Sequence, residues 1–119
     1  MPGKILCVSF DAAVSDLRCG ALRQAGYAVT PTLKIGEARE FLSRDKFDLV
    51  LIGHRFSPEE KRSLAKMAKE ECRTVVLLVQ SGSVDASIPA DSRVSALGGT
   101  TALLSAAETL LAKQKPAAA

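Results

Sequence analysis

The most constraining feature of this 119-residue chain is the run FDLVLIG at residues 47–53. Positions 49–52 are all apolar, so a strand formed by them must be covered on both faces. Inner strands of a parallel sheet that carries helices on both sides have this pattern. The carboxyl ends of such strands open into the crevice where α/β proteins place their chemistry. Here that place holds Gly53, His54 and Arg55, none of which accepts a phosphoryl group stably or holds a hard metal ion alone.

Strands and helices are predicted to alternate along the rest of the chain. Consecutive apolar residues favour strands, and apolar residues three and four positions apart favour helices. We expect strands at residues 4–9, 27–30, 47–53, 74–79 and 94–97. The apolar helix faces are expected at Val14, Leu17, Ala21, Leu22 and Ala25, at Ile35, Ala38, Phe41 and Leu42, at Leu64, Ala65, Ala68 and Cys72, and at Leu103, Leu104, Ala107, Leu110 and Leu111. With right-handed crossovers, this alternation predicts an α/β fold, a doubly wound parallel sheet with helices on both faces.

Several local signals mark the ends of these helices. Ser57, Pro58 and Glu60 form the pattern of a capping box, with proline at the first helical position. Asp11 is suited to cap the first helix, and Gly26 is suited to end it. We therefore expect the first helix to lie between Asp11 and Gly26, and the third to begin after Ser57.

Two segments depart from this regular pattern. Residues 81–93 are rich in Ser, Asp and Pro, and Pro89 disfavours a long regular helix there. Residues 115–119 follow the last helix and read as a disordered tail. The sequence predicts a single domain over residues 1–114, with no internal linker and no repeat.

Composition excludes several classes of protein. The 16 basic and 13 acidic residues leave a net charge of +3, which is too small and too dispersed to indicate direct nucleic-acid binding. No segment approaches the ~20 apolar residues of a membrane span, and the first residues lack the apolar region of a signal peptide. Cys7, Cys19 and Cys72 have no zinc-type or disulfide-type spacing. These features predict a cytoplasmic protein with reduced thiols, and Cys7 is expected to be a small core residue.

Three stretches resemble segments of one protein family. The residues KILCV at 4–8, LRQAGYAV at 22–29 and FDLVLI at 47–52 resemble the first strand, the approach to the second strand and the third strand of the receiver (CheY-like) domain of two-component response regulators. The resemblance extends over nearly the whole chain. It implies a flavodoxin-like five-stranded sheet of order 2-1-3-4-5, in which residues 81–93 form a short or irregular fourth helix.

The same resemblance implies that the family's phosphorylation chemistry is absent. That chemistry needs an acidic pair for magnesium, a phosphoacceptor aspartate, a hydroxyl and a lysine that offsets phosphoryl charge. The matching positions hold other residues: Ser9 and Phe10 for the acidic pair, Gly53 for the aspartate, Gln80 (or Ser81, one register later) for the hydroxyl and Gly98 for the lysine. The resemblance thus implies a degenerate pseudo-receiver, not an enzyme, that needs no metal or cofactor and acts by binding a protein partner or a second copy of itself.

An alternative function rests on the residues around the vacated position. His54, Arg55, Gly99 and Thr100 are expected at the ligand-binding edge, where a helix N-terminus favours anions. A small-ligand or anion sensor could use this pocket, although a tight glycine turn and a solvent-facing histidine would account for the same residues. The chain has no glycine-rich nucleotide motif, and a lone histidine without a nucleophile does not indicate catalysis.

Overall fold

The computed structural model describes residues 3–81 and 87–114 and contains one five-stranded sheet. Its strands are β1 (Lys4–Val8), β2 (Ala28–Thr32), β3 (Leu49–Ile52), β4 (Val75–Gln80) and β5 (Ser92–Ser95). Neighbouring strands are parallel, and their order is β2-β1-β3-β4-β5. This order confirms the predicted α/β fold.

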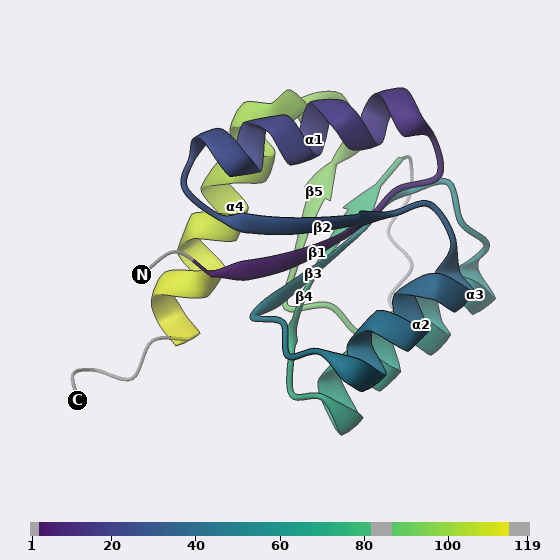
Figure 1. Ribbon diagram of the computed structural model, residues 1–119. Coiled ribbons are helices and arrows are strands. Elements are labelled where there is room, and N and C mark those ends of the chain that lie inside the picture. The colour runs from purple at the N-terminus through teal and green to yellow at the C-terminus, as the bar shows by residue number, and fades with distance from the viewer. Residues whose placement is uncertain (1–2, 82–86, 115–119) are drawn as a thin grey trace.

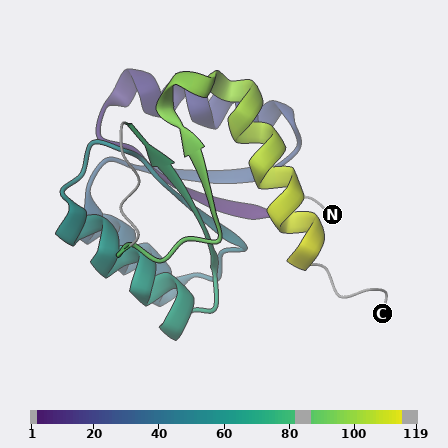
Figure 2. The same cartoon turned by 180° about the vertical axis from the view of Figure 1, so that it is seen from behind.

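Helices cover both faces of the sheet. They are α1 (Ala12–Gln24), α2 (Ile35–Arg44), α3 (Pro58–Lys66), which continues into a π-helical turn at Met67–Glu71, and α4 (Gly99–Gln114), which follows a 3-10 turn at Ala96–Gly98. Helices α1 and α4 lie on one face and α2 and α3 on the other (Figure 1), and the reverse view in Figure 2 shows the same layers. No helix in the described ranges is both long and apolar enough to cross a membrane.

The central strand β3 contributes to two separate hydrophobic cores. Val50 and Ile52 pack in the core beneath α2 and α3, whereas Leu49 and Leu51 pack in the core beneath α1 and α4. All four side chains are at most 1% exposed. The prediction that this strand is covered on both faces is therefore confirmed.

The predicted helix caps are present. The Ser57 hydroxyl accepts a hydrogen bond from the Glu60 backbone N–H at 3.1 Å, and the Glu60 carboxylate accepts one from the Ser57 N–H at 3.1 Å. The Asp11 carboxylate accepts hydrogen bonds from the N–H groups of Ala13 and Val14 at 2.8 and 3.2 Å. These interactions satisfy backbone donors that have no partner inside the helix.

The inner face of α1 differs from the prediction. Its fully buried residues are Ser15, Cys19 and Leu22, whereas the Leu17 side chain is 66% exposed. The physical reason is that small side chains at positions 15 and 19 let the helix lie close to the sheet. Leu17 is two residues from Ser15, or about 200° around the helix, and so points away from the sheet.

The fifth strand also differs from the prediction, which was residues 94–97. It begins earlier, at Ser92, because the Asp91 carboxylate accepts a hydrogen bond from the Val76 N–H at 2.8 Å and forms an ion pair with Lys69 at 2.8 Å. It ends earlier because the Ser95 hydroxyl accepts a hydrogen bond from the Leu97 N–H at 3.1 Å and begins a turn. Leu97 is consequently 93% exposed.

The second strand runs to Thr32, beyond the predicted end at residue 30. Backbone hydrogen bonds of Ala28 and Thr32 are directed at the β1 side of the strand. The alternation along a strand therefore directs the backbone groups of Val29 and Pro31 outward. The Val29 carbonyl accepts a hydrogen bond from the Arg23 guanidinium at 3.2 Å, and Pro31 has no N–H.

The remaining expectations concern less regular parts of the chain. Among residues 81 and 87–91, which the structure describes between β4 and β5, there is no helix, while residues 82–86 lie outside the described part. The expected tail at residues 115–119 also lies outside it. Cys7 is fully buried, as predicted, and all three cysteines are free thiols.

Removal of the Ser57 cap should lower stability. We expect Ser57→Ala to reduce the free energy of unfolding by about 1 kcal/mol, because the N–H of Glu60 loses its acceptor. Urea denaturation followed by circular dichroism measures the change. The matched control is Ser105→Ala in the exposed face of α4, where the change should stay within about 0.5 kcal/mol. Equal effects of both variants would contradict this role of Ser57.

Candidate functional site

The loop after β1 carries no carboxylate at the first two positions. Ser9 is fully buried, donates its N–H to the Thr32 carbonyl at 3.1 Å and lies with its hydroxyl 3.7 Å from the Cys7 sulfur. The Phe10 ring is 57% exposed and makes an edge-to-face contact with Phe56, with centroids 6.0 Å apart. The nearest acid in sequence, Asp11, caps α1. At the edge of the sheet, this loop therefore presents the aromatic ring of Phe10 and the carboxylate of Asp11 that caps α1.

Gly53 follows β3 at a place where a side chain would be crowded. Its N–H donates to the Val8 carbonyl at 2.8 Å. A Cβ atom added to Gly53 would lie 3.1 Å from that same carbonyl oxygen and 3.2 Å from Nη1 of Arg18. Both approaches are tighter than ordinary van der Waals contact. The guanidinium of Arg18 thus occupies the space into which a side chain at position 53 would project.

The Arg18 side chain extends toward Gly53 from α1, the helix that follows β1. The side chain is half-buried, and burial lowers the pKa of its guanidinium. No hydrogen bond or ion pair joins it to any other residue in the described ranges. Sequence reasoning missed Arg18. The available signal was its spacing, because Arg18 follows Val14 by four positions and precedes Leu22 by four, which puts a cation on the inner side of the helix.

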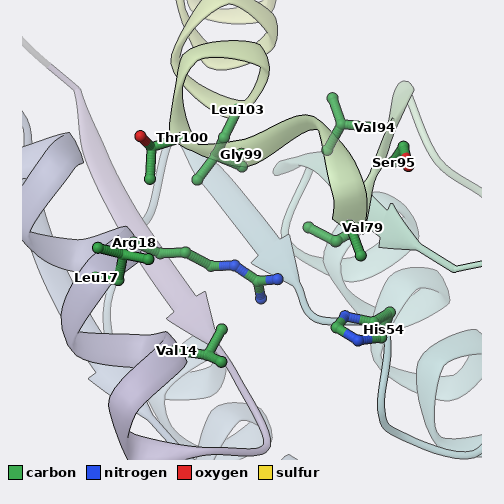
Figure 3. A pocket seen from close by; sticks show the side chains of 11 residues that line it. Val14, Leu17, Arg18, His54, Val79, Val94, Ser95, Gly99, Thr100 and Leu103 are labelled. Atoms are coloured by element: carbon green, nitrogen blue, oxygen red, sulfur yellow. The ribbon is translucent and has the colours of Figure 1, made fainter.

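Arg18 lines two hollows at this edge of the sheet. The larger has a volume of about 200 Å³ and lies between α1, the ends of β4 and β5, and the start of α4. Figure 3 shows the Arg18 side chain extending across it toward the His54 ring. The smaller hollow lies against Gly53. Val14, Arg18 and His54 line both hollows.

The residues predicted for a site are divided between these hollows. His54, Gly99 and Thr100 line the larger one, whereas Phe10, Gly53 and Arg55 line the smaller one together with His54. The remaining predicted positions line neither: Ser9, Gln80 and Gly98. Gly98 is exposed in the 3-10 turn, and a Cβ atom there would lie 3.0 Å from the Ala102 Cβ. The cation that both hollows share is Arg18, not Arg55.

Two buried polar atoms at this edge have no hydrogen-bond partner in the part of the chain that the structure describes. They are Nδ1 of His54 and Oε1 of Gln80. A buried polar atom without a partner costs free energy, so such atoms mark places where a ligand or water can bind. His54 therefore presents an unused ring nitrogen beside an unused guanidinium.

The surroundings of His54 favour its neutral form. Burial lowers the pKa of His54 from its usual 6.5, and the positive charges of Arg18, Arg55 and Lys61 lower it further. The Lys61 ammonium also donates a hydrogen bond to the His54 carbonyl oxygen at 3.2 Å. The edge of the sheet around His54 is thus a place of positive potential.

The residues at this edge do not fit a magnesium ion. Magnesium prefers hard oxygen ligands, usually one or two carboxylates. The only acid that lines either hollow is Asp11, whose carboxylate already accepts two backbone hydrogen bonds. No group of three or more His, Cys, Asp or Glu side chains with metal-binding geometry occurs among the described residues.

The single histidine of the chain makes the electrostatics of this edge measurable. We expect NMR titration to place the pKa of His54 below 6.5, and Arg18→Met to raise it because a neighbouring positive charge is removed. Arg44→Met, in the last turn of α2, is the control and should leave it unchanged.

The lowered pKa of His54 also predicts that the stability of the protein depends on pH. The unfolded chain binds the His54 proton more tightly than the folded chain, so this contribution to stability is complete above pH 6.5. It decreases as the pH falls from 6.5 through the folded-state pKa. Unfolding of the wild type and of His54→Asn across this range should differ in slope, and identical slopes would contradict the assignment.

Comparison with solved structures identifies the fold. The chain is similar to a CheY-like response regulator receiver domain from Methanospirillum hungatei JF-1, with 21% identity, a TM-score of 0.85 and coverage of 96% of this chain and 97% of that one. It is also similar to the receiver domain of a signal transduction histidine kinase from Syntrophus aciditrophicus, with 22% identity, a TM-score of 0.82 and coverage of 98% and 97%. A response regulator from Thermotoga maritima has 22% identity, a TM-score of 0.81 and coverage of 94% and 99%.

Two comparisons that use the sequence found no match for this chain. No protein-family model matches it, and no curated protein matches it significantly. Similarity in structure at this level of identity concerns the arrangement of the backbone and not the chemistry of the site. The chain has the CheY-like, flavodoxin-like fold of response regulator receiver domains.

Proposed function

We propose that this protein is a receiver-like signalling module that is not phosphorylated and that acts by binding a protein partner. The observation that carries the proposal is the position of the Arg18 guanidinium, 3.2 Å from where a Cβ atom of residue 53 would lie. A phosphoacceptor in the corresponding place would need a carboxylate with free space in front of it. Gly53 supplies no carboxylate, and Arg18 fills that space.

The surrounding residues support the same proposal. Formation of an acyl phosphate requires stabilisation of developing negative charge by a metal ion and positive groups around the acceptor. The loop after β1 presents Ser9 and Phe10, which offer no metal-binding carboxylate, and residue 98 is a glycine with no ammonium group. An arginine without an acceptor aspartate holds no phosphoryl group covalently. We therefore propose a binding module and not an enzyme.

The proposed mode of action is recognition of another protein, or of a second copy of this chain. With no covalent switch, the partner's own concentration or a bound ligand would control the interaction. The fold likeness to receiver domains supports a role in signalling. Affinity capture with the full chain from a lysate of its native host, followed by mass spectrometry, tests whether a signalling component is bound.

The absence of phosphorylation is directly testable. We expect no phosphoryl adduct by intact-mass spectrometry after incubation with magnesium and acetyl phosphate, and no change in Tm with magnesium and beryllofluoride. A receiver domain that retains its phosphoacceptor aspartate is the positive control. An adduct on any aspartate of the wild-type protein would refute the proposal.

A substitution at Gly53 makes the phosphorylation test more specific. Gly53→Asp should also stay unmodified, because Arg18 and the Val8 carbonyl crowd the new side chain. It should be destabilised by roughly 1–3 kcal/mol, as inserted groups in packed sites are. Gly53→Asp combined with Arg18→Ala should recover part of that loss, since one of the two crowding groups is removed. Full stability of Gly53→Asp alone would show that the space is open.

A second candidate function is the sensing of a small anionic ligand. One observation favours it: the half-buried Arg18 guanidinium and the buried Nδ1 atom of His54 line the same cavity, and neither has a partner in the described ranges. A ligand bound there could control partner binding without phosphorylation. The chemistry of that ligand is considered next.

A further inference from the structure

The geometry points to a binding site for a small aliphatic carboxylate in the 200 Å³ cavity between α1 and α4, with Arg18 as the residue that pairs with the carboxylate. This inference deepens the second candidate function and depends on it. The cavity opens at the ends of β4 and β5 and lies to one side of Gly53. It is therefore a different place from the position of the phosphoacceptor in receiver domains.

The charge of Arg18 is the first reason for an anionic ligand. Removing a guanidinium from water without a counter-charge is costly. No acidic residue lines the larger cavity, and Asp11, in the adjoining hollow, caps α1 and forms no ion pair with Arg18. A carboxylate that entered the cavity would supply the missing charge. The planar guanidinium binds a carboxylate through two parallel hydrogen bonds.

Further donors surround the same space. His54 directs its ring toward the Arg18 guanidinium (Figure 3), and its Nδ1 atom has no hydrogen-bond partner in the described part of the chain. When that nitrogen carries the proton, it can donate to a carboxylate oxygen. Gly99 and Thr100 begin the 16-residue helix α4 at the wall of the cavity. The free N–H groups and the dipole of its first turn add attraction for an anion.

The apolar walls of the cavity indicate the chemistry of the uncharged part of the ligand. Apolar side chains from four elements line it: Val14, Leu17, Val79, Val94 and Leu103. A volume of about 200 Å³ is below the usual range of roughly 300–1,000 Å³ for sites that hold drug-sized molecules. A ligand with one carboxylate and a short branched or linear aliphatic chain satisfies both the charge and the walls. Inorganic phosphate would satisfy the charge and leave the apolar walls uncovered.

The test is an NMR titration of the full chain, labelled with nitrogen-15, with 3-methylbutanoate as the probe. We expect saturable shifts of the Arg18 side-chain N–H and of the backbone N–H groups of Gly99 and Thr100. The affinity should be in the millimolar range, as for ligands of a few heavy atoms. Parallel titrations use 3-methylbutanamide, which lacks the charge, and acetate and inorganic phosphate, which lack the aliphatic chain. Each of these should bind at least about fivefold more weakly.

Variants locate the interaction. Arg18→Met keeps the aliphatic stem and should weaken binding at least tenfold, since a charged hydrogen bond is lost. Arg18→Lys keeps the charge without the planar fork and should have an intermediate effect. Arg23→Met, on the same helix but outside the cavity, is the control and should bind like the wild type. Dispersed amide spectra of each variant show that the fold is retained.

Several outcomes would overturn the inference. They are equal binding of the amide and the carboxylate, tighter binding of phosphate than of 3-methylbutanoate, no saturable shift, or loss of binding in Arg55→Met but not in Arg18→Met. The titration contains neither magnesium nor a phosphodonor. Its failure is therefore distinguishable from a failure of the phosphorylation test, which concerns Gly53 and not the cavity.

Discussion

The two-sided burial of β3 is the constraint on which the rest of the structure depends. Successive side chains of this strand point alternately into two opposite cores. All four side chains of the strand are at most 1% exposed. A strand of this kind needs neighbours on both edges and helices on both faces. The positions of β1, β4 and the helices all follow from that requirement. The carboxyl end of β3 then lies at the centre of the edge where ligands of such folds bind.

At that edge, the group on which the proposed function depends is the Arg18 guanidinium, which comes from a helix and not from a strand. The resemblance to receiver domains drew attention to positions 9, 10, 53, 80 and 98, where reactive groups were expected to be missing. The structure adds that a cation lies in front of position 53, because Arg18 extends from α1 over Gly53. With His54 and the start of α4, Arg18 gives the cavity a positive lining without an acidic partner among its lining residues. The proposals on phosphorylation and on carboxylate binding both depend on this one side chain.

Much of the fold could be predicted from local patterns, because those patterns are strong where burial is complete. The strands β1, β3 and β4, which each contain at least four consecutive apolar residues, were predicted within one or two residues of their observed ends, and the capping box at Ser57 was predicted as well. The edge strand β5 was misplaced because it pairs only with β4 and does not need continuous apolar residues. Leu17 was assigned to the wrong face of α1 because hydrophobicity outweighed the small residues Ser15 and Cys19. Arg18 was missed because the reach of a long side chain depends on how the helix is rotated against the sheet.

The outer side of β2 has a consequence for self-association. An exposed strand can recruit a strand of another molecule and form a continuous sheet between copies. Here the outward carbonyl of Val29 is already bonded to Arg23, and Pro31 offers no outward donor. A joined intermolecular sheet along this border would therefore lose two of the hydrogen bonds that hold such a sheet together. If two copies of this chain associate, their contact is expected through helices or loops instead.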